Sequence, residues 1–173
     1  LYETLPRPLV LDADGLNALA ELGASRPAPA APRILTPHPG EFRRLCGEPD
    51  SRTSREDQCR QAIELAGRCG WVLVLKGHRT LITDGHRVTY NSSGNPGMAT
   101  GGAGDVLTGV ITALVCQGLA PFEAAQLGVY LHGLAGDLAA EQLGQASLIA
   151  RDLVTYLPQA FRRLSEGNTQ DSK

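Results

Sequence analysis

A glycine-rich stretch at residues 91–109 has the residue types and the spacing needed for chemistry on a phosphate. Five glycines precede Asp105 within it, namely Gly94, Gly97, Gly101, Gly102 and Gly104. An apolar helical pattern begins directly after Asp105, so the glycines form a loop that leads into the first turn of a buried helix. The free N–H groups and the positive dipole end of such a helix bind anions, typically phosphate. The candidate nucleotide-binding residues of this loop are Gly101, Gly102, Ala103 and Gly104.

Asp105 is the candidate catalytic residue of the stretch. Phosphoryl transfer needs an anion cradle, a positioned nucleophile and a base. The backbone amides of residues 102–105 are the predicted cradle, and a carboxylate beside it can take a proton from a substrate hydroxyl. The alternative is that Asp105 only caps the helix, which would leave the long run of glycines without a purpose.

Lys76 and Gly77 follow the most apolar strand pattern of the sequence, Trp71–Leu75. One interpretation is a lysine whose stem lies along the buried strand while its ammonium group reaches water. The other places the segment after the strand along a nucleotide, because ligands of parallel sheets bind beyond the carboxyl ends of the strands. The candidate nucleotide-binding residues of this segment are Lys76, Gly77, His78, Arg79 and Thr80.

Two more polar groups follow predicted strands. His38 lies between two prolines in T-P-H-P-G-E, a stiff turn that either brings its ring to a substrate or is a surface turn with a helix-capping Glu41. Asp12, Asp14 and Asn17 follow the strand at residues 8–13 and either cap a helix or orient water, magnesium or phosphate. The candidate substrate-binding residues are His38, Asn17 and Asp105. All these motifs are expected on one rim of a sheet.

Strand and helix patterns alternate along the chain. Expected strands span residues 8–13, 33–36, 71–75, 80–83 and 87–90, the last two as a hairpin, and expected helices span 16–22, 41–45, 53–68, 106–115, 121–143 and 147–164. We expect Thr53 with Glu56 to form a capping box, and Ser147 to cap the last helix. The order predicts an α/β fold with three layers, a mostly parallel sheet with helices on both faces. Residues 1–165 form one domain, and the polar tail at 166–173 is predicted to be disordered.

Composition excludes several classes of function. The 173 residues carry a formal net charge of −2, so electrostatic attraction to nucleic acid or to an anionic membrane is not expected. No apolar run is long enough to span a bilayer, and residues 1–4 do not resemble a signal peptide. The four cysteines lack metal-ligand spacing, so we expect reduced thiols, no structural metal site and a cytoplasmic location.

The motifs together resemble one family. L-D-A-D-G-L-N-A-L, I-L-T-P-H-P-G-E, L-K-G-H-R-T-L-I and N-S-S-G-N-P-G-M-A-T-G-G-A-G-D-V-L-T-G are similar to the ribokinase-like NAD(P)H-hydrate dehydratases, over residues 8–157. The G-G-A-G-D segment alone indicates only the ribokinase superfamily. The resemblance implies a ribokinase-like fold, of which residues 1–165 would be the C-terminal major part, because this chain starts after the first strands and glycine-rich loop of the family.

The resemblance also implies an activity, that of a hydro-lyase in metabolite repair. ADP, or ATP, phosphorylates the hydroxyl of hydrated NADH or NADPH (NADHX or NADPHX), and loss of phosphate restores the reduced cofactor. His38 and Asp105 would contact the hydrated nucleotide, with Asp105 as the base, and Lys76 to Thr80 with Gly104 would line the adenine nucleotide. Mg²⁺ is implied without assigned ligands. A homo-oligomer is implied too, tetrameric in bacterial relatives, or else a chain attached to a missing N-terminal region.

Two other functions remain open on the sequence alone. A small-molecule kinase of the same superfamily, acting on a vitamin alcohol, would share the phosphate cradle and Asp105 but would not need T-P-H-P-G-E. A nucleotide-binding regulator without turnover is the third hypothesis. The products separate the first two: a kinase leaves a stable phosphorylated product, whereas the dehydratase leaves reduced cofactor and free phosphate.

Overall fold

Five strands pair in chain order to form one sheet: β1 (Leu9–Leu11), β2 (Arg33–Leu35), β3 (Trp71–Leu75), β4 (Leu81–Thr83) and β5 (Val88–Tyr90). The computed structural model describes residues 1–23, 28–49 and 52–170. The pairs β1–β2 and β2–β3 are parallel, whereas β3–β4 and β4–β5 are antiparallel. The predicted α/β class is therefore confirmed, and the parallel part of the sheet is confined to β1, β2 and β3.

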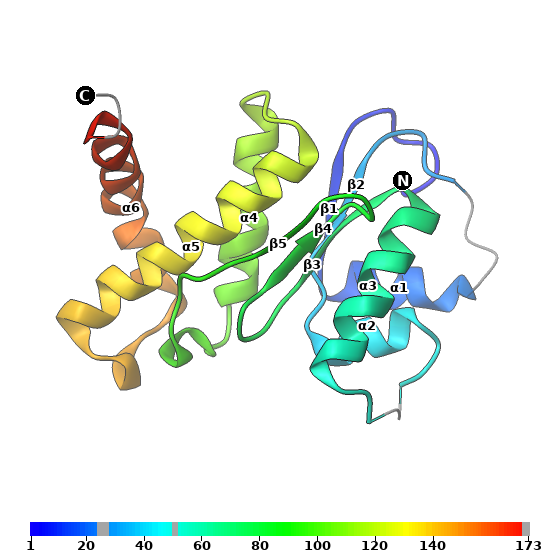
Figure 1. The fold of residues 1–173 in the computed structure, drawn as a ribbon, viewed down its shortest axis with the longest axis horizontal. Coiled ribbons are helices and arrows are strands. Elements are labelled where there is room, and N and C mark those ends of the chain that lie inside the picture. Colours follow the sequence, from blue (N-terminus) through cyan, green and yellow to red (C-terminus); the bar gives the residue numbers. More distant parts are fainter. Residues whose placement is uncertain (24–27, 50–51, 171–173) are drawn as a thin grey trace.

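Helices cover both faces of the sheet, as Figure 1 shows. On one face lie α1 (Asp14–Glu21), α2 (Pro39–Leu45) and α3 (Arg55–Cys69), and on the other lie α4 (Ala103–Cys116) and α5 (Pro121–Leu143). The long helix α6 (Ala150–Gln170) packs outside this second layer, against α5 and α4. The side chains of β3 alternate between the two cores and are all buried, which explains its unbroken apolar sequence.

The cap of α3 differs from the prediction by one residue. Ser54 is the N-cap, and its Oγ accepts a hydrogen bond from the backbone N–H of Asp57 at 3.1 Å. The predicted capping box of Thr53 and Glu56 is therefore wrong. Both positions carry a residue that can cap a helix, and only the path of the chain into α3 decides between them.

Both ends of the last helix also differ from the prediction. α6 begins at Ala150, where Asp152 Oδ2 accepts from the backbone N–H of Ile149 at 3.0 Å. The hydroxyl of Ser147 donates instead to the carbonyl of Leu143 at the end of α5, so Ser147 does not cap α6. α6 continues to Gln170, beyond the predicted end near Leu164, and residues 171–173 of the predicted disordered tail lie outside the described residues.

The segment between α1 and β2 contains no helix or strand at residues 28–32, and residues 24–27 lie outside the described residues. The thiols predicted from the sequence are found at all four cysteines, each of which lies outside any disulfide. In the described part of the chain, every helix is too short or too polar to cross a membrane.

Candidate functional site

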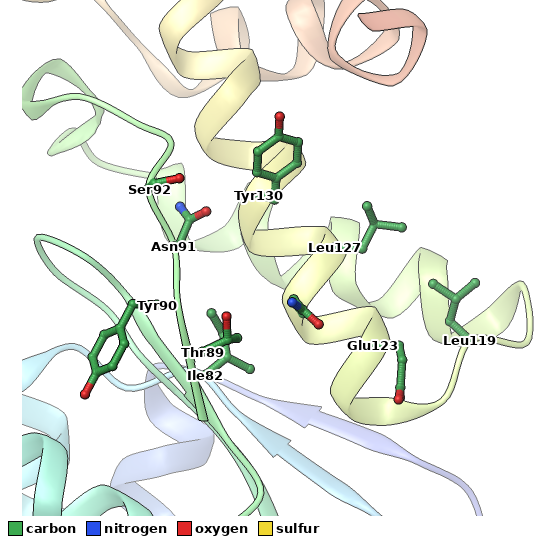
Figure 2. A pocket seen from close by; sticks show the side chains of 10 residues that line it. Ile82, Thr89, Tyr90, Asn91, Ser92, Leu119, Glu123, Leu127 and Tyr130 are labelled. Carbon is green, nitrogen blue, oxygen red and sulfur yellow. The ribbon is translucent and has the colours of Figure 1, made fainter. Parts of the chain in front are cut away.

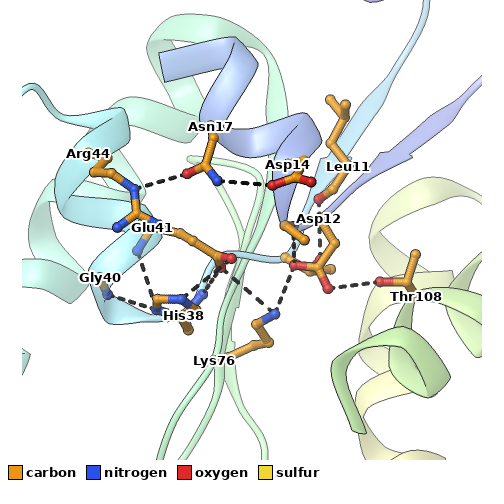
Figure 3. A network of polar contacts seen from close by, with 12 residues as sticks. Leu11, Asp12, Asp14, Asn17, His38, Gly40, Glu41, Arg44, Lys76 and Thr108 are labelled. Carbon is orange, nitrogen blue, oxygen red and sulfur yellow. Dashed lines mark hydrogen bonds and ion pairs between the residues drawn. The ribbon is translucent and has the colours of Figure 1, made fainter. Parts of the chain in front are cut away.

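The carboxyl ends of β1, β2 and β3 bring Asp12, His38 and Lys76 to one rim, opposite the first turn of α4 (Figure 3). The Lys76 ammonium lies 2.8 Å from Asp12 Oδ1 and 3.9 Å from Glu41 Oε2. A methyl group placed on Gly104 would lie 3.3 Å from Asp12 Oδ2 and 3.4 Å from Lys76 Nζ. The parallel strands thus assemble motifs that are far apart in the sequence, as the rim hypothesis predicted.

The first turn of α4 presents backbone donors to this rim. Gly102 is the N-cap at φ 85°, a left-handed conformation that favours glycine, and no side chain caps the helix. Among the described residues, the N–H groups of Gly104 and Asp105 have no acceptor, whereas Ala103 donates to the carbonyl of Thr100 and Val106 to that of Gly102. Free donors at the positive end of a helix form an anion site.

Asp105 lies in this turn with an exposed side chain. Within the described part of the chain, its carboxylate accepts no hydrogen bond and forms no ion pair. Asp105 is therefore not the cap of α4, and the capping interpretation of this residue is wrong. What the geometry offers is an unbonded carboxylate beside two free N–H groups.

The glycine-rich loop before α4 is held by α5. Asp137 accepts hydrogen bonds from the backbone N–H of Gly94 at 2.7 Å and from Asn95 Nδ2 at 2.9 Å. Gly133 and Gly136 of α5 leave room for the loop, because a methyl group on either would lie 2.2 Å from a side-chain atom of the loop. No local sequence pattern indicates this anchoring role of Asp137, because Gly94 lies 43 residues away along the chain.

His38 is the N-cap of α2. Its Nδ1 accepts from the backbone N–H groups of Gly40 at 3.0 Å and Glu41 at 3.3 Å, while Glu41 Oε2 accepts from the N–H of His38 at 2.8 Å. Because Nδ1 accepts, the neutral ring carries its proton on Nε2, which lies 3.4 Å from Glu41 Oε1. The capping reading of this turn is confirmed, and the half-exposed ring remains open to a ligand. Its contact with a substrate stays a prediction.

Asn17 occupies a different part of the rim. Its Oδ1 accepts from Arg44 Nε at 2.9 Å, a bond that joins α1 to α2, and its amide lies 3.5 Å from Asp14 Oδ1 within α1 (Figure 3). The structure therefore does not bring Asn17 into hydrogen-bond contact with Lys76 or with α4. Its assignment as a substrate-binding residue stays a prediction.

The predicted nucleotide-binding segment after β3 is a tight turn. Gly77 and Arg79 have φ angles of 136° and 51°, and the Thr80 hydroxyl donates to the Gly77 carbonyl at 3.0 Å. Arg55 of α3 fixes the start of the turn by donating to the carbonyls of Leu75 at 3.0 Å and Lys76 at 3.2 Å. The backbone of the turn is thus rigidly attached to α3.

The side chains of this segment divide between two places. His78 and Arg79 line a cavity of about 470 Å³ beside α3, and the Arg79 guanidinium lies 5.6 Å from the centre of the Tyr90 ring. Only the Lys76 side chain reaches the cluster at the rim. A role for His78 and Arg79 in nucleotide binding stays a prediction. A nucleotide that contacts these two side chains would lie on the side of the turn that faces α3.

His132 of α5 is buried behind the first turn of α4. Its Nε2 lies 3.0 Å from the carbonyl oxygen of Ala103, which can only accept, so Nε2 carries the proton. The pKa of His132 is lowered to about 4, mainly by burial and also by the nearby charge of Lys76, although the hydrogen bond to Ala103 acts in the opposite direction. His132 is therefore a buried histidine whose ring is satisfied by a backbone carbonyl.

A second hollow lies away from the rim, between β5 and α5 (Figure 2). Its volume is about 410 Å³, and its walls include Ile82, Leu127 and Tyr130. None of the residues that the sequence analysis assigned to the site lines it. The candidate site is therefore the rim between β1–β3 and α4.

The fold, with its glycine-rich turn at the start of α4, is that of a ribokinase-like α/β protein. The hydroxyethylthiazole kinase of Pyrococcus horikoshii superposes with a TM-score of 0.67, covering 90% of this chain and 59% of that one, but at 18% identity it supports the fold alone. The sequence pattern of the NAD(P)H-hydrate dehydratase family matches residues 2–159. The chain belongs to that family.

Several members of the family are close in sequence. The bifunctional NAD(P)H-hydrate repair enzyme of Thermofilum pendens is 48% identical over 169 residues, which are 96% of this chain and 32% of that protein. The ADP-dependent (S)-NAD(P)H-hydrate dehydratase of Neisseria meningitidis is 41% identical over 157 residues, covering 88% of this chain and 53% of that protein. The ADP/ATP-dependent NAD(P)H-hydrate dehydratase of Bacillus subtilis, co-crystallised with ATP and Mg²⁺, superposes with a TM-score of 0.79 at 36% identity, covering 90% of this chain and 55% of that one. The chain thus spans from a third to about half of the length of these relatives.

Proposed function

We propose that this chain carries the phosphoryl-transfer site of a nucleotide-dependent NAD(P)H-hydrate dehydratase, a metabolite-repair hydro-lyase. The observation that supports this most is the first turn of α4, where two free N–H groups lie beside the unbonded carboxylate of Asp105. An anion cradle next to a free base is the arrangement that phosphorylation of a hydroxyl requires. Membership of the dehydratase family supports the hydroxyl of the hydrated nicotinamide ring as the group that is phosphorylated.

The reaction then has two parts. Asp105 accepts the proton of the ring hydroxyl while the hydroxyl oxygen attacks the terminal phosphoryl group of ADP or ATP. The donor leaves as the nucleotide with one phosphate fewer. The amides of Gly104 and Asp105 and the Lys76 ammonium stabilise the charge on the transferred group. Phosphate then departs together with a ring proton, which restores the double bond of NADH or NADPH. Phosphate is a far better leaving group than hydroxide, and this is the purpose of the nucleotide.

The residues at the rim fit magnesium that arrives with the nucleotide. In the described ranges, no three potential ligands among His, Cys, Asp and Glu are grouped closely enough to hold a metal ion by themselves. Mg²⁺ usually takes one or two carboxylates and completes its shell with water and substrate phosphates. The rim carries the carboxylates of Asp12, Glu41 and Asp105, of which Asp105 alone has no partner in the described part of the chain, and a bound Mg²⁺ would neutralise phosphate charge there.

The test is a single-turnover assay of hydrated NADH with the purified chain, in which the absorbance of the reduced nicotinamide is followed with ADP and with ATP in separate experiments. We expect reduced cofactor and free phosphate in equal amounts, with no turnover in the absence of nucleotide. A stable phosphorylated vitamin alcohol would identify a kinase instead. Nucleotide binding without any product would identify a regulator.

The assembly and location of the protein are further proposals. α6 exposes Val154 and Phe161, Ile149 just before it is exposed too, and an exposed apolar surface of this kind is usually covered by another protein surface. We therefore retain the homo-oligomer as the expected state, together with a cytoplasmic location. Light scattering tests the first, and a monodisperse monomer would contradict it.

A further inference from the structure

The Asp12 carboxylate joins three segments of the site (Figure 3). Its Oδ1 accepts from the Lys76 ammonium at 2.8 Å and from the backbone N–H of Ala13 at 2.9 Å, and its Oδ2 accepts from the Thr108 hydroxyl of α4 at 3.1 Å. Only 10% of the Asp12 side chain is exposed. The ends of β1 and β3 are thereby tied to the helix whose N-terminus forms the anion site.

The backbone next to Asp12 is strained in a way that fits this role. Ala13 has φ 48° and ψ −117°, a conformation that costs free energy for a residue with a side chain. Strain of this kind persists where surrounding contacts fix the chain, and here the Ala13 N–H is held by Asp12 Oδ1. The turn after β1 is shaped to aim the Asp12 carboxylate at Lys76 and Thr108.

The partner of Asp12 is an unusual residue in this chain. The sequence has 16 basic residues, of which only Lys76 and Lys173 are lysines. The Lys76 ammonium lies 3.4 Å from the position of a methyl group on Gly104, so it occupies a narrow space that suits a compact point charge better than a planar guanidinium. Lys76 therefore points at the backbone where the transferred phosphoryl group would lie.

We propose that Asp12 is a positioning residue: it holds the Lys76 ammonium against the first turn of α4, so that the ammonium meets the transferred phosphoryl group in the right place. The expected effect on phosphoryl transfer rests on the proposed function, whereas the positioning of the Lys76 ammonium does not. Without the Asp12 carboxylate, the nearest remaining acid is Glu41 at 3.9 Å, on α2. The ammonium would then move toward α2 and away from α4.

The charges at the site distinguish a role of Asp12 in positioning Lys76 from a role in nucleotide binding. Asp12 is an anion beside a phosphate site, so replacing it with Asn removes a repulsion and leaves nucleotide affinity equal or higher. A misplaced ammonium still attracts phosphate but no longer stabilises the charge that develops during transfer. For a displacement of about 1 Å we expect Asp12→Asn to slow phosphoryl transfer about 10- to 100-fold. A purely structural role would instead weaken binding, turnover and thermal stability together.

The first experiment observes Lys76 directly by NMR, in protein labelled with ¹³Cε-lysine. Only two lysine signals exist, and Lys76→Ala assigns them by the loss of one. We expect the two Hε protons of Lys76 to have separate shifts in the wild type, as in an immobilised side chain, and to merge in Asp12→Asn. Thr108→Val keeps the charges and removes only the hydroxyl that anchors Asp12, so it should reduce the separation, and it serves if Asp12→Asn does not fold.

The second experiment measures single-turnover rate and Mg-ADP affinity in Asp12→Asn, Lys76→Ala and the double variant. If Asp12 acts through Lys76, the double variant is no slower than Lys76→Ala alone. Glu141→Gln, which removes one exposed acid of α5, is the control with unchanged rate. Absence of turnover in the wild type would refute the proposed function, while the NMR spectra would still decide the role of Asp12. Unmerged Hε signals in Asp12→Asn and Thr108→Val, or additive losses of rate, would overturn the inference.

Discussion

Replacement of Asp105 by Asn is the most direct perturbation of the proposed chemistry. The side chain keeps its size, and no hydrogen bond or ion pair is lost, because the carboxylate has none in the described part of the chain. The only stabilising term removed is the favourable interaction of a negative charge with the N-terminal end of the α4 dipole, about 0.3–1 kcal/mol for an exposed group. We therefore expect the variant to fold, with a melting temperature close to that of the wild type.

The effect on the reaction should be much larger. An amide cannot accept the proton of the ring hydroxyl, and a positioned general base contributes about 100- to 10,000-fold to a rate. This range corresponds to roughly 3–5 kcal/mol of transition-state stabilisation. Nucleotide affinity should stay constant or increase, because Asp105→Asn removes a negative charge beside the anion site.

Melting temperature, Mg-ADP affinity and single-turnover rate can be measured on one preparation. Loss of rate with intact stability and affinity would support Asp105 as the base. An Asp105→Asn protein that restores the reduced cofactor at the wild-type rate would refute the assignment. A large fall in melting temperature would show instead that the side chain has a structural contact, contrary to the geometry of α4.

Three further predictions follow from the same site. Lys76→Ala should weaken Mg-ADP binding by about 1–3 kcal/mol in calorimetry, because a charge-assisted contact is lost, and an unchanged dissociation constant would remove Lys76 from the site. Gly104→Ala should keep the helix but weaken nucleotide binding, since its methyl group would lie 3.4 Å from the ammonium, whereas Gly109→Ala on the same helix meets nothing within 4 Å and should bind normally. His132 has a folded pKa of about 4 against 6.5 when unfolded, so its contribution to stability is complete above pH 6.5 and is lost as pH falls toward 4, by roughly 3 kcal/mol. Urea denaturation at several pH values across this range should show the fall in the free energy of unfolding, and His132→Gln should reduce that fall.

The layers of the fold could be predicted because they depend on local patterns. Trp71–Leu75 is apolar at every position, and the structure buries all five residues between two helical layers. The helix over Pro121–Leu143 is apolar nearly all round, since it packs against both the sheet and α6. Because parallel strands share one carboxyl edge, the positions of the motifs on one rim also followed from the strand order.

The contacts within the rim could not be predicted in the same way. Asp12 bonds to residues 64 and 96 positions away, and no local pattern selects which polar side chains meet across such separations. The sequence does contain one indication that Thr108 belongs to the site. It lies three residues after Asp105 and is therefore near the same face of the helix. The antiparallel hairpin of β4 and β5 was predicted, but the antiparallel pairing of β4 with β3 was not. The sheet is therefore less parallel than predicted.

The hydrogen bonds of the rim also explain how three carboxylates can have different tasks. Asp12 is occupied by an ammonium, a hydroxyl and a backbone N–H, and Glu41 is occupied by the N–H and the ring of His38. Oxygens engaged by donors in this way are not available to bind a substrate hydroxyl. Asp105 alone among the three has an exposed and unbonded carboxylate. The same sequence feature, an acid at a strand or helix end, therefore binds a cation in one place, caps a helix in another, and is available for the proposed role of base only where the described fold leaves it without a partner.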